Sequence, residues 1–325
     1  MATILVTGGA GYVGSHACKA LTRAGHVPVT YDNLERGHRE FVKWGPLEVG
    51  DICDPARLSD VLARHKPAAV MHFAALTLVN ESVEQPEVYH RNNVGGTQCL
   101  LAAMAAARVG VIVVSSSCAV YGIPAKVPIA ETEACIPVNP YGQNKLDMER
   151  LLAQSEKENG LAWVALRYFN AAGGDPDGEI GEWHDPEQHL IPCVLDVPLG
   201  RAAAVVINGE DYPTPDGTCV RDYVHVTDIA AAHLQALAYA TSHSGGTAFN
   251  LGTSSGSSVR EVVETARVVT GHAIPIILGV RRPGDAPSLV ADARRARDVL
   301  GWSPRRSSLA AQISDAWAWH KKLHG

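Results

Sequence analysis

Short apolar runs and helix-forming segments alternate through the first half of the chain. The apolar runs have the length of strands and cover residues 2–7, 27–31, 46–49, 68–72, 111–114 and 162–168. Helical patterns cover residues 14–24, 55–65 and 85–108, and a further one begins at Tyr141. Because strands joined by helices pair in parallel, the pattern predicts an α/β fold with a doubly wound parallel sheet, and ligands at the carboxyl ends of its strands.

A glycine-rich turn follows the first strand. Gly8, Gly11 and Gly14 are spaced three residues apart, a helix follows them, and the second strand ends at Asp32. Strand, glycine turn, helix, strand and acid in this order are typical of a Rossmann dinucleotide site, in which the helix N-terminus faces the phosphates. An acid in that place favours NAD, because a 2′-phosphate would be repelled. The sequence therefore predicts an NAD site here.

The pattern changes after Asn170. Residues 173–185 are rich in Gly, Asp, Glu and Pro, which predicts a long surface loop. Helices are expected at 189–199, 227–241, 258–270, 292–300 and 309–323, and strands at 203–207 and 248–251. We therefore expect residues 1–170 to form the NAD-binding domain and residues 171–325 a smaller mixed α/β lobe that binds substrate. Parts of about 225–255 are expected to return to the first domain.

Composition narrows the possible functions. The 325 residues carry a net charge of −6, so no general basic field points to nucleic acid. The apolar runs are far shorter than a membrane span, and no signal peptide is expected before the first strand. Seven cysteines are scattered without C-x-x-C spacing, which indicates reduced thiols and no metal site. We expect a cytoplasmic protein.

Tyr141 and Lys145 are placed for acid–base chemistry. Pro140 marks the start of a helix, and residues four apart on a helix lie on one face. An ammonium about 4–5 Å from a phenol is worth roughly 4 kcal/mol at an effective dielectric of about 20. That interaction would lower the pKa of the phenol from about 10 towards about 7, which suits a general base. Ser117 stands at the carboxyl end of the predicted strand that begins at Val111.

Taken together, these features resemble the extended short-chain dehydrogenase/reductase superfamily. Within this superfamily, the sequence motifs are most similar to those of the UDP-glucose (UDP-galactose) 4-epimerase family. The glycine turn is specific only to the superfamily, whereas Asp-Gly-Thr at 216–218 and Val-Arg-Asp-Tyr-Val-His-Val at 220–226 are more specific to 4-epimerases. The matching stretches span nearly the whole chain, at residues 6–16, 32–34, 72–75, 115–117, 139–142, 166–170, 211–214, 216–218, 220–226 and 282–285.

The resemblance implies roles for individual residues. The catalytic residues would be Ser117, Tyr141 and Lys145. NAD would be bound by Gly8, Gly11, Tyr12, Val13, Gly14, Asp32, Asn33, Asp51, Ile52, Phe73, Ala74, Ala75, Asn93, Tyr141, Lys145, Tyr168 and Phe169. A UDP-sugar would be bound by Ser117, Tyr141, Asn170, His189, Leu190, Arg221, Arg282, Asp285 and Leu289. Among these, Arg221 and Arg282 would clamp the diphosphate and Asp285 the ribose.

The implied reaction is an epimerisation at C4 of the sugar. The C4 hydroxyl is oxidised transiently, the 4-keto sugar rotates, and hydride returns to its other face. Leu289 stands where a tyrosine is associated with rejecting N-acetyl sugars, so UDP-N-acetylhexosamines are expected to react as well. The helix at 85–108 and the Tyr141 helix often form a dimer interface in the superfamily, and we expect a homodimer.

Several positions depart from the family pattern, and other activities stay open. Thr77, Asn208 and Cys118 stand where a lysine, an aromatic residue and an alanine or threonine are common. Epimerisation of UDP-pentoses is one alternative. A 4,6-dehydratase is less favoured, because it needs an acid just after Ser117, where Cys118-Ala119 stand. A non-catalytic NAD-binding regulator and a simple dehydrogenase that releases NADH are the remaining alternatives.

Overall fold

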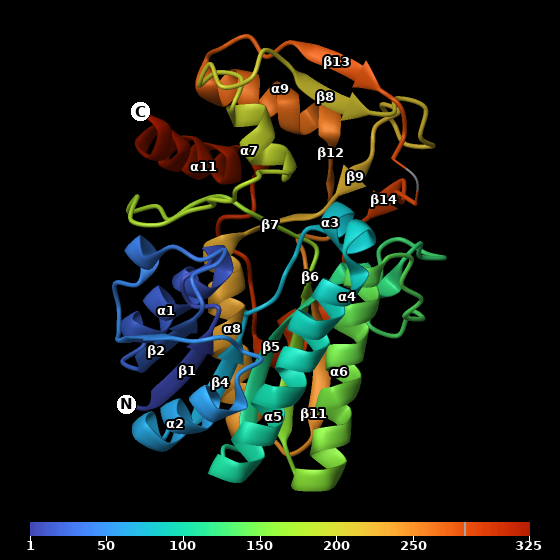
Figure 1. The fold of residues 1–325 in the computed structure, drawn as a ribbon. Coiled ribbons are helices and arrows are strands. Elements are labelled where there is room, and N and C mark those ends of the chain that lie inside the picture. The colour runs from blue at the N-terminus through green and yellow to red at the C-terminus, as the bar shows by residue number, and fades with distance from the viewer. Residues whose placement is uncertain (283) are drawn as a thin grey trace.

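A seven-stranded parallel sheet forms the centre of the chain. The computed structural model describes residues 1–282 and 284–325, so Pro283 of the 282–285 motif lies outside the described residues. The strand order is β11-β6-β5-β4-β1-β2-β3, and every pairing is parallel (Figure 1). This confirms the predicted doubly wound sheet. The strands are β1 (Thr3–Thr7), β2 (Val27–Asp32), β3 (Leu47–Val49), β4 (Ala69–His72), β5 (Val111–Ser117), β6 (Ala162–Tyr168) and β11 (Gly246–Leu251).

Alternating side chains of β1 supply two cores, one on each face of the sheet. Ile4 and Val6 pack with α1 (Tyr12–Arg23) and α8 (Val226–Ser242). Leu5 points the other way and packs with α2 (Pro55–His65), α5 (Gly96–Ala107) and α6 (Pro140–Asn159). Since successive strand residues face opposite sides, an uninterrupted apolar run is what a strand covered on both faces requires.

Two predicted helices differ from the observed ones. The segment expected as one helix over 85–108 consists of α4 (Pro86–Tyr89), a π-helical stretch (His90–Gly95) and α5, and α3 (Val79–Glu84) precedes it. The helix expected over 189–199 is only α7 (Leu190–Leu195). Pro198 follows closely, and the residue before a proline disfavours helical backbone.

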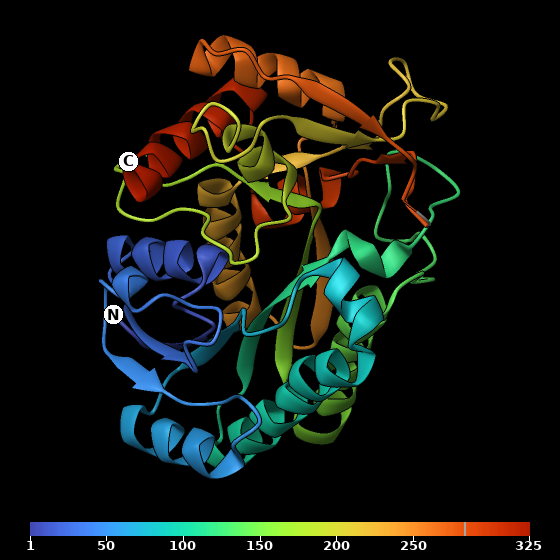
Figure 2. The same ribbon diagram turned by 45° about the horizontal axis from the view of Figure 1, so that its top comes forward.

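A smaller lobe covers the end of the sheet at which the site forms (Figure 2). Its own core joins α7, α9 (Val259–Thr270) and α11 (Leu309–His324). The remaining elements are β7 (Asn170–Ala172), β8 (Val205–Asn208), β9 (Val220–Arg221), β10 (Tyr223–His225), β12 (Ser257–Ser258), β13 (Ile276–Gly279), β14 (Ser288–Leu289), α10 (Arg294–Leu300) and the short 3-10 helices Arg39–Phe41 and Cys118–Tyr121. Among the described residues, no helix has the length and apolar character to cross a membrane.

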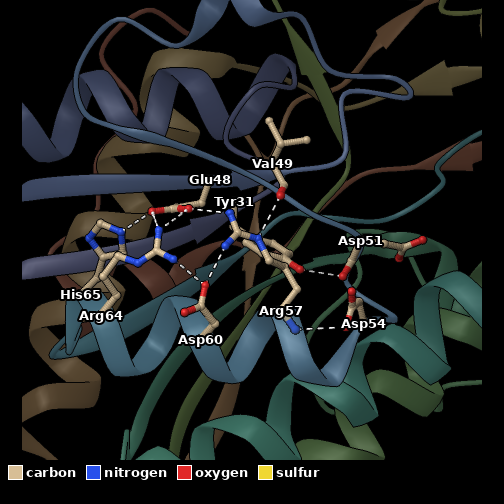
Figure 3. A network of polar contacts seen from close by, with 9 residues as sticks. All are labelled: Tyr31, Glu48, Val49, Asp51, Asp54, Arg57, Asp60, Arg64 and His65. Atoms are coloured by element: carbon tan, nitrogen blue, oxygen red, sulfur yellow. Dashed lines mark hydrogen bonds and ion pairs between the residues drawn. The ribbon is translucent and has the colours of Figure 1, made fainter.

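Helix α2 is fastened to the edge of the sheet by a polar network around Glu48 of β3 (Figure 3). The Glu48 carboxylate is bonded to His65 Nε2 at 2.6 Å, Arg57 Nη2 at 2.6 Å and Arg64 Nη1 at 3.0 Å. Glu48 is 8% exposed, so these contacts are only partly screened by water. The hydrogen bond from His65 is the largest cause that lowers the pKa of Glu48, and burial opposes it.

Replacing Glu48 by glutamine should destabilise the fold. Glu48→Gln keeps the shape but removes the charge, and we expect the free energy of unfolding at pH 7 to fall by about 1–3 kcal/mol. A carboxyl whose pKa is lowered on folding stabilises fully above its unfolded pKa, and this stabilisation is lost as the pH falls through its lower folded pKa. The difference from wild type should therefore begin to shrink as the pH falls below about 4 and vanish only below the folded pKa of Glu48. Urea unfolding across this pH range measures it.

Glu264→Gln is the matched control, because Glu264 is exposed and pairs with Arg267 one turn away on α9. It should change stability by less than about 0.5 kcal/mol. An equal effect of both substitutions would contradict the assigned role of Glu48.

Candidate functional site

A cavity of about 1310 Å³ lies between the carboxyl ends of the sheet strands and the smaller lobe. Pockets for a single drug-sized ligand measure roughly 300–1,000 Å³, so this cavity has room for more than one such molecule. Its wall includes residues just after β1, β2, β4, β5 and β6, as the topology of a doubly wound sheet requires. The site is therefore where the sequence pattern placed it.

The glycine turn forms the floor of this cavity at the start of α1. Gly8 has φ +74°, and a Cβ there would lie 2.5 Å from the Ala74 backbone nitrogen. A Cβ on Gly14 would lie 2.1 Å from the Gly8 carbonyl oxygen. Packing therefore demands these two glycines. Gly11 is different, because the nearest atom to its Cβ would be 3.3 Å away.

Gly11 keeps the N-terminus of α1 open. It is the N-cap residue, its backbone is extended, and it lines the cavity. A side chain there would fill the space in front of the first amides of the helix, which is the space a phosphate group takes at such a terminus. The cradle therefore fits the diphosphate of a dinucleotide.

Asp32 is held at the end of β2 by two backbone amides. Its Oδ2 accepts from Ala10 N at 3.0 Å and its Oδ1 from Leu34 N at 2.9 Å. Burial raises the pKa of Asp32, and both hydrogen bonds act against that rise. Gly37 was missed by the sequence analysis. A Cβ there would lie 2.8 Å from Asp32 Oδ1, so this glycine leaves the carboxylate uncovered on the side facing the loop.

Most predicted site residues meet in the cavity, but three do not line it. Those that line it are Gly8, Gly11, Tyr12, Val13, Gly14, Asp32, Asn33, Ile52, Phe73, Ala74, Ala75, Ser117, Tyr141, Tyr168, Phe169, Asn170, His189, Leu190, Arg221, Arg282, Asp285 and Leu289. Asp51, Asn93 and Lys145 stand behind the wall. The cofactor contacts expected of Asp51, Asn93 and Lys145 remain predictions.

In the ligand-free chain, the side chains of Asp51 and Asn93 form hydrogen bonds with backbone groups in and beside the cavity wall. The Asp51 carboxylate accepts from Cys53 N at 2.7 Å. The Asn93 amide accepts from Leu76 N at 2.8 Å and donates to Leu76 O at 2.9 Å. Leu76 belongs to the segment after β4 that lines the cavity. Asn93 thus positions that segment, and no short-range pattern in the sequence indicates such a contact.

Ser117, Tyr141 and Lys145 come together at the ends of β5 and α6. Asn139 caps α6 by accepting from Gly142 N at 2.8 Å, which places Tyr141 in the first turn. The Ser117 side chain lies close enough to the Tyr141 hydroxyl to lower the pKa of the phenol. Lys145 lies one turn further on, is 2% exposed and donates to Ser115 O at 2.9 Å. Its Nζ lies 5.8 Å from the centroid of the Tyr141 ring.

Burial controls the titration of this group in the ligand-free chain. It raises the pKa of Tyr141, the neighbouring Tyr168 adds to the rise, and the Ser117 side chain opposes it. The expected pKa near 7 is therefore wrong for this state. Burial also lowers the pKa of Lys145 to about 8, against the attraction of Glu149. Glu149 itself is bonded to Arg167, at 2.9 Å from Nε, which ties its charge elsewhere.

The lobe contributes two arginines to the opposite wall. Arg221 pairs with Asp285 and donates to Ala286 O at 2.9 Å. Arg282 is exposed, and the Asn208 amide, oriented to satisfy both groups, accepts from its Nε and Nη2 at 3.1 Å. Asn208 stands at a position where an aromatic residue is common in the family. In this chain its side chain contacts the Arg282 guanidinium. Arg282 is free of an acidic partner among the described residues.

The sequence analysis overlooked the neighbours of His189. Glu182, His184 and Glu187 gather around its ring, and all four belong to one loop before α7. Burial raises the pKa of Glu182 above its ordinary value, and the nearby histidines act against that rise. The spacing Glu-x-His-x-x-Glu-x-His over residues 182–189 could have indicated this cluster from the sequence. Cysteine spacing alone does not reveal it.

Comparisons with known proteins agree over the full chain. The model of the NAD dependent epimerase/dehydratase family matches residues 4–252. A UDP-glucose 4-epimerase of Rhizobium leguminosarum bv. trifolii is 51% identical over 320 residues, covering 98% of each chain. The structure of the UDP-glucose 4-epimerase from Brucella ovis in complex with NAD has 49% identity and a TM-score of 0.95, and covers 98% of each chain. One from Stenotrophomonas maltophila, with bound NAD and formylated UDP-arabinopyranose, has 38% identity and a TM-score of 0.96, and covers 99% of each chain.

Removing the buried charge of Lys145 should stabilise the ligand-free chain. The pKa of Lys145 falls from 10.5 to about 8 on folding, so the charged form is penalised at pH 7. We expect Lys145→Met to raise the free energy of unfolding by about 1–3 kcal/mol at pH 7. The unfolded wild-type chain binds more protons between the two pKa values, so the difference should shrink as the pH rises through that range.

Urea unfolding at several pH values measures this effect. Lys157→Met is the control, since Lys157 is exposed on the same helix and should change stability by less than about 0.5 kcal/mol. If Lys145→Met were less stable than wild type at pH 7, the ammonium would be stabilising in its site.

Proposed function

Because this chain belongs to the NAD dependent epimerase/dehydratase family, we propose that it is a UDP-glucose 4-epimerase, an isomerase that interconverts UDP-glucose and UDP-galactose. The observation that carries the proposal is the placement of Tyr141 and Ser117 in the wall of the cavity, opposite Arg221 and Arg282. A UDP-sugar bound here would have its sugar at Tyr141 and Ser117 and its diphosphate at the two arginines. The cavity also extends to the glycine turn, where a dinucleotide would bind.

The residues at the glycine turn fit NAD. Asp32 would accept hydrogen bonds from the adenosine ribose, and the open N-terminus of α1 would face the diphosphate. When bound, NAD supplies a reversible hydride acceptor next to C4 of the sugar and a positively charged nicotinamide ring. Lys145 lies behind Tyr141 and would contact the nicotinamide ribose after a small side-chain movement from the Ser115 carbonyl.

Tyr141 would take the proton of the C4 hydroxyl. In the ligand-free chain, burial holds the Tyr141 phenol in its protonated form. The positive charge of a bound nicotinamide ring would favour the phenolate. Ser117, which lies beside the phenol, would hold the C4 oxygen and relay its proton to Tyr141. When the keto sugar has turned over, the same pair would return the proton to the C4 oxygen as hydride is delivered to the other face of C4.

The lobe would hold the UDP part while the sugar turns. Arg221 and Arg282 present planar donors, which suit two neighbouring phosphates better than lysines do. Asn170, at the start of β7, would contact the phosphates, and Asp285 would accept from ribose hydroxyls. His189 and Leu190 line the same cavity near the start of α7. Holding only the nucleotide leaves the sugar free to rotate about its bond to the diphosphate.

Several classes of UDP-sugar are candidate substrates for this cavity. UDP-pentoses are a second candidate class, because the relative from Stenotrophomonas maltophila was solved with formylated UDP-arabinopyranose. A 4,6-dehydratase is disfavoured, since the residues after Ser117 are Cys118 and Ala119 and supply no acid. UDP-N-acetylhexosamines would need extra room beside the sugar, and Leu289, which lines the cavity, is the residue that we expect to set that room.

Tyr141→Phe tests the catalytic assignment. It keeps the ring but removes the ionisable hydroxyl, so kcat for conversion of UDP-glucose should fall at least about 100-fold. Product analysis should show the 4-epimer without net NADH release in wild type. The variant should keep its bound NAD, as measured by absorbance of the protein-bound nucleotide. Turnover near the wild-type rate would exclude Tyr141 as the base, and stoichiometric NADH release would favour a dehydrogenase.

Leu289→Tyr tests the sugar specificity. Leu289 packs against the cluster around Phe169 and also lines the cavity. We expect wild type to epimerise UDP-N-acetylhexosamines measurably, and the larger tyrosine to lower that rate about tenfold or more relative to UDP-glucose. Kinetics with both substrates measure the ratio, and Leu289→Met, which nearly preserves volume, is the control. Loss of both reactions by the same factor, or a wild type inactive on N-acetyl sugars, would refute the idea.

The homodimer is a further part of the proposal. α5 and α6 lie side by side on one face of the sheet (Figure 1). The large apolar residues Leu100, Leu101 and Met104 of α5 are buried within the chain. The outer face of α5 carries exposed Ala102, Ala105 and Ala106, which would allow a second copy to approach closely. Light scattering should give twice the chain mass at micromolar concentration, and a monomer would end this part of the proposal.

A further inference from the structure

We propose that Glu182, His184, Glu187 and His189 bind a divalent transition-metal ion of the Zn²⁺ class. One potential ligand atom from each of the four side chains lies within 4.8 Å of the others. The site is separate from the proposed acid–base group at Ser117 and Tyr141, and it goes beyond the proposed epimerase activity. It would place a metal ion in the wall of the cavity, in the loop that leads into α7.

Each histidine nitrogen of the cluster lies close to both carboxylates, at separations near those between the ligands of a tetrahedral metal ion. Bonds of about 2.0–2.1 Å from Zn²⁺ put neighbouring ligand atoms about 3.3 Å apart in tetrahedral geometry. His189 Nδ1 lies 3.1 Å from Glu182 Oε1 and 2.9 Å from Glu187 Oε1. His184 Nδ1 lies 3.5 Å from Glu182 Oε1 and 3.5 Å from Glu187 Oε2. An ion at the centre would draw the four ligand atoms, now within 4.8 Å of one another, to separations of about 3.3 Å.

Hydrogen bonding within the chain leaves part of this group unsatisfied. His189 and Glu187 form a hydrogen bond at 2.9 Å. In contrast, His184 Nδ1 is buried and has no hydrogen-bond partner among residues 1–282 and 284–325. The side chain of Glu182 is 4% exposed, and among the described residues its carboxylate is paired with histidines alone, at 3.1 Å from His189 Nδ1 and 3.5 Å from His184 Nδ1. A buried nitrogen such as His184 Nδ1 is rarely left without a partner, and a bound ion would satisfy it.

The charges also favour a cation at this point. Glu182 and Glu187 bring two carboxylates into a region with little water, and in the described part of the chain histidines are their only ion-pairing partners. Two carboxylates and two neutral imidazoles would exactly balance a divalent ion in charge. Imidazole ligands favour zinc and its neighbours over Mg²⁺ or Ca²⁺, which prefer all-oxygen sites.

A second acidic group in the same chain shows the contrast. Asp175, Asp177 and Glu179 also bring their carboxylates together. There, however, Lys19 Nζ occupies the centre, at 2.6 Å from Asp175, 2.7 Å from Asp177 and 2.6 Å from Glu179. The protein supplies its own cation to that group, so no metal ion is expected. This difference provides an internal control for the experiment.

The position in the fold indicates what the ion would do. His189 is the N-cap residue of α7 in the smaller lobe. The ring of His184 packs edge-on against Tyr12 of α1, with ring centroids 6.3 Å apart. An ion held by both histidines would therefore fasten the loop between the helix at the dinucleotide cradle and the lobe that faces it. Binding should stabilise the folded chain, because the unfolded chain does not hold the four ligands together.

Zn²⁺ binding by the tag-free full-length protein tests the proposal. The protein is stripped with a chelator, and Zn²⁺ is then titrated in competition with a chromophoric chelator. We expect one tight equivalent per chain and a rise in Tm on binding. His184→Ala should weaken binding at least tenfold, and Glu182→Gln should do the same. Substitution with Co²⁺ should give visible absorption bands of tetrahedral strength in wild type and lose them in His184→Ala.

Two variants serve as matched controls. His272→Ala removes an exposed histidine far along the chain, bonded to the Thr270 carbonyl, and Asp177→Asn alters the group that surrounds Lys19. Both should bind Zn²⁺ as wild type does. Failure of wild type to bind a stoichiometric ion, or unchanged binding in His184→Ala, would overturn the proposal. If Glu182→Gln does not fold, as judged by circular dichroism, His184→Ala decides alone. These readouts do not depend on epimerase activity.

Discussion

The close approach of Gly8 to the start of the segment after β4 is the constraint on which the site depends. Gly8 N donates to Tyr31 O at 2.8 Å, and Thr7 O accepts from Phe73 N at 2.8 Å and from Ala74 N at 3.1 Å. The ends of β1, β2 and β4 are thereby joined at one turn. Any side chain at Gly8 would collide with backbone atoms of that segment. The same turn starts α1, so the three strands and the open helix terminus are positioned together.

In the proposed catalytic group, the buried ammonium of Lys145 lowers the stability of the folded chain. Lys145 is buried with a backbone carbonyl as its hydrogen-bond partner, while Glu149 one turn further along α6 is engaged by Arg167 and Ser116. His72 nearby is buried and hydrogen bonded to Thr7 and Thr97, and burial lowers its pKa to about 3, so it adds no charge. The surrounding core must therefore outweigh the cost of one poorly compensated ammonium.

Contacts between the glycine-turn helix and the 173–179 loop connect the two halves of the chain. The Tyr12 hydroxyl donates to Gly173 O at 2.6 Å, and Lys19 gathers the carboxylates of Asp175, Asp177 and Glu179. These are polar contacts with an apolar core on either side. They hold the smaller lobe over the carboxyl ends of the strands without filling the space between. The cavity is the consequence of this arrangement, and so is the nearness of the 182–189 loop to α1.

The sequence by itself determined the order of the main strands and helices of the sheet, because local physics decides them. The uninterrupted apolar run of β1, the glycine spacing and the Pro140–Tyr141 helix start are all readable within about ten residues, and each was observed. The position of β11 beside β6, at the edge of the sheet, required the whole fold. Asn93 likewise found its partner in Leu76, seventeen residues earlier in the chain.

Only the tertiary structure decided the electrostatics. The four-residue spacing of Tyr141 and Lys145 correctly placed them on one helix, but the pKa of the phenol depends on what covers it. Desolvation is set by residues from β5, β6 and the 3-10 helix after Ser117, whose arrangement no local pattern contains. The same holds for the Glu–His loop. Its letters are visible in the sequence, whereas the convergence of its ligand atoms follows from packing against α1 and α7.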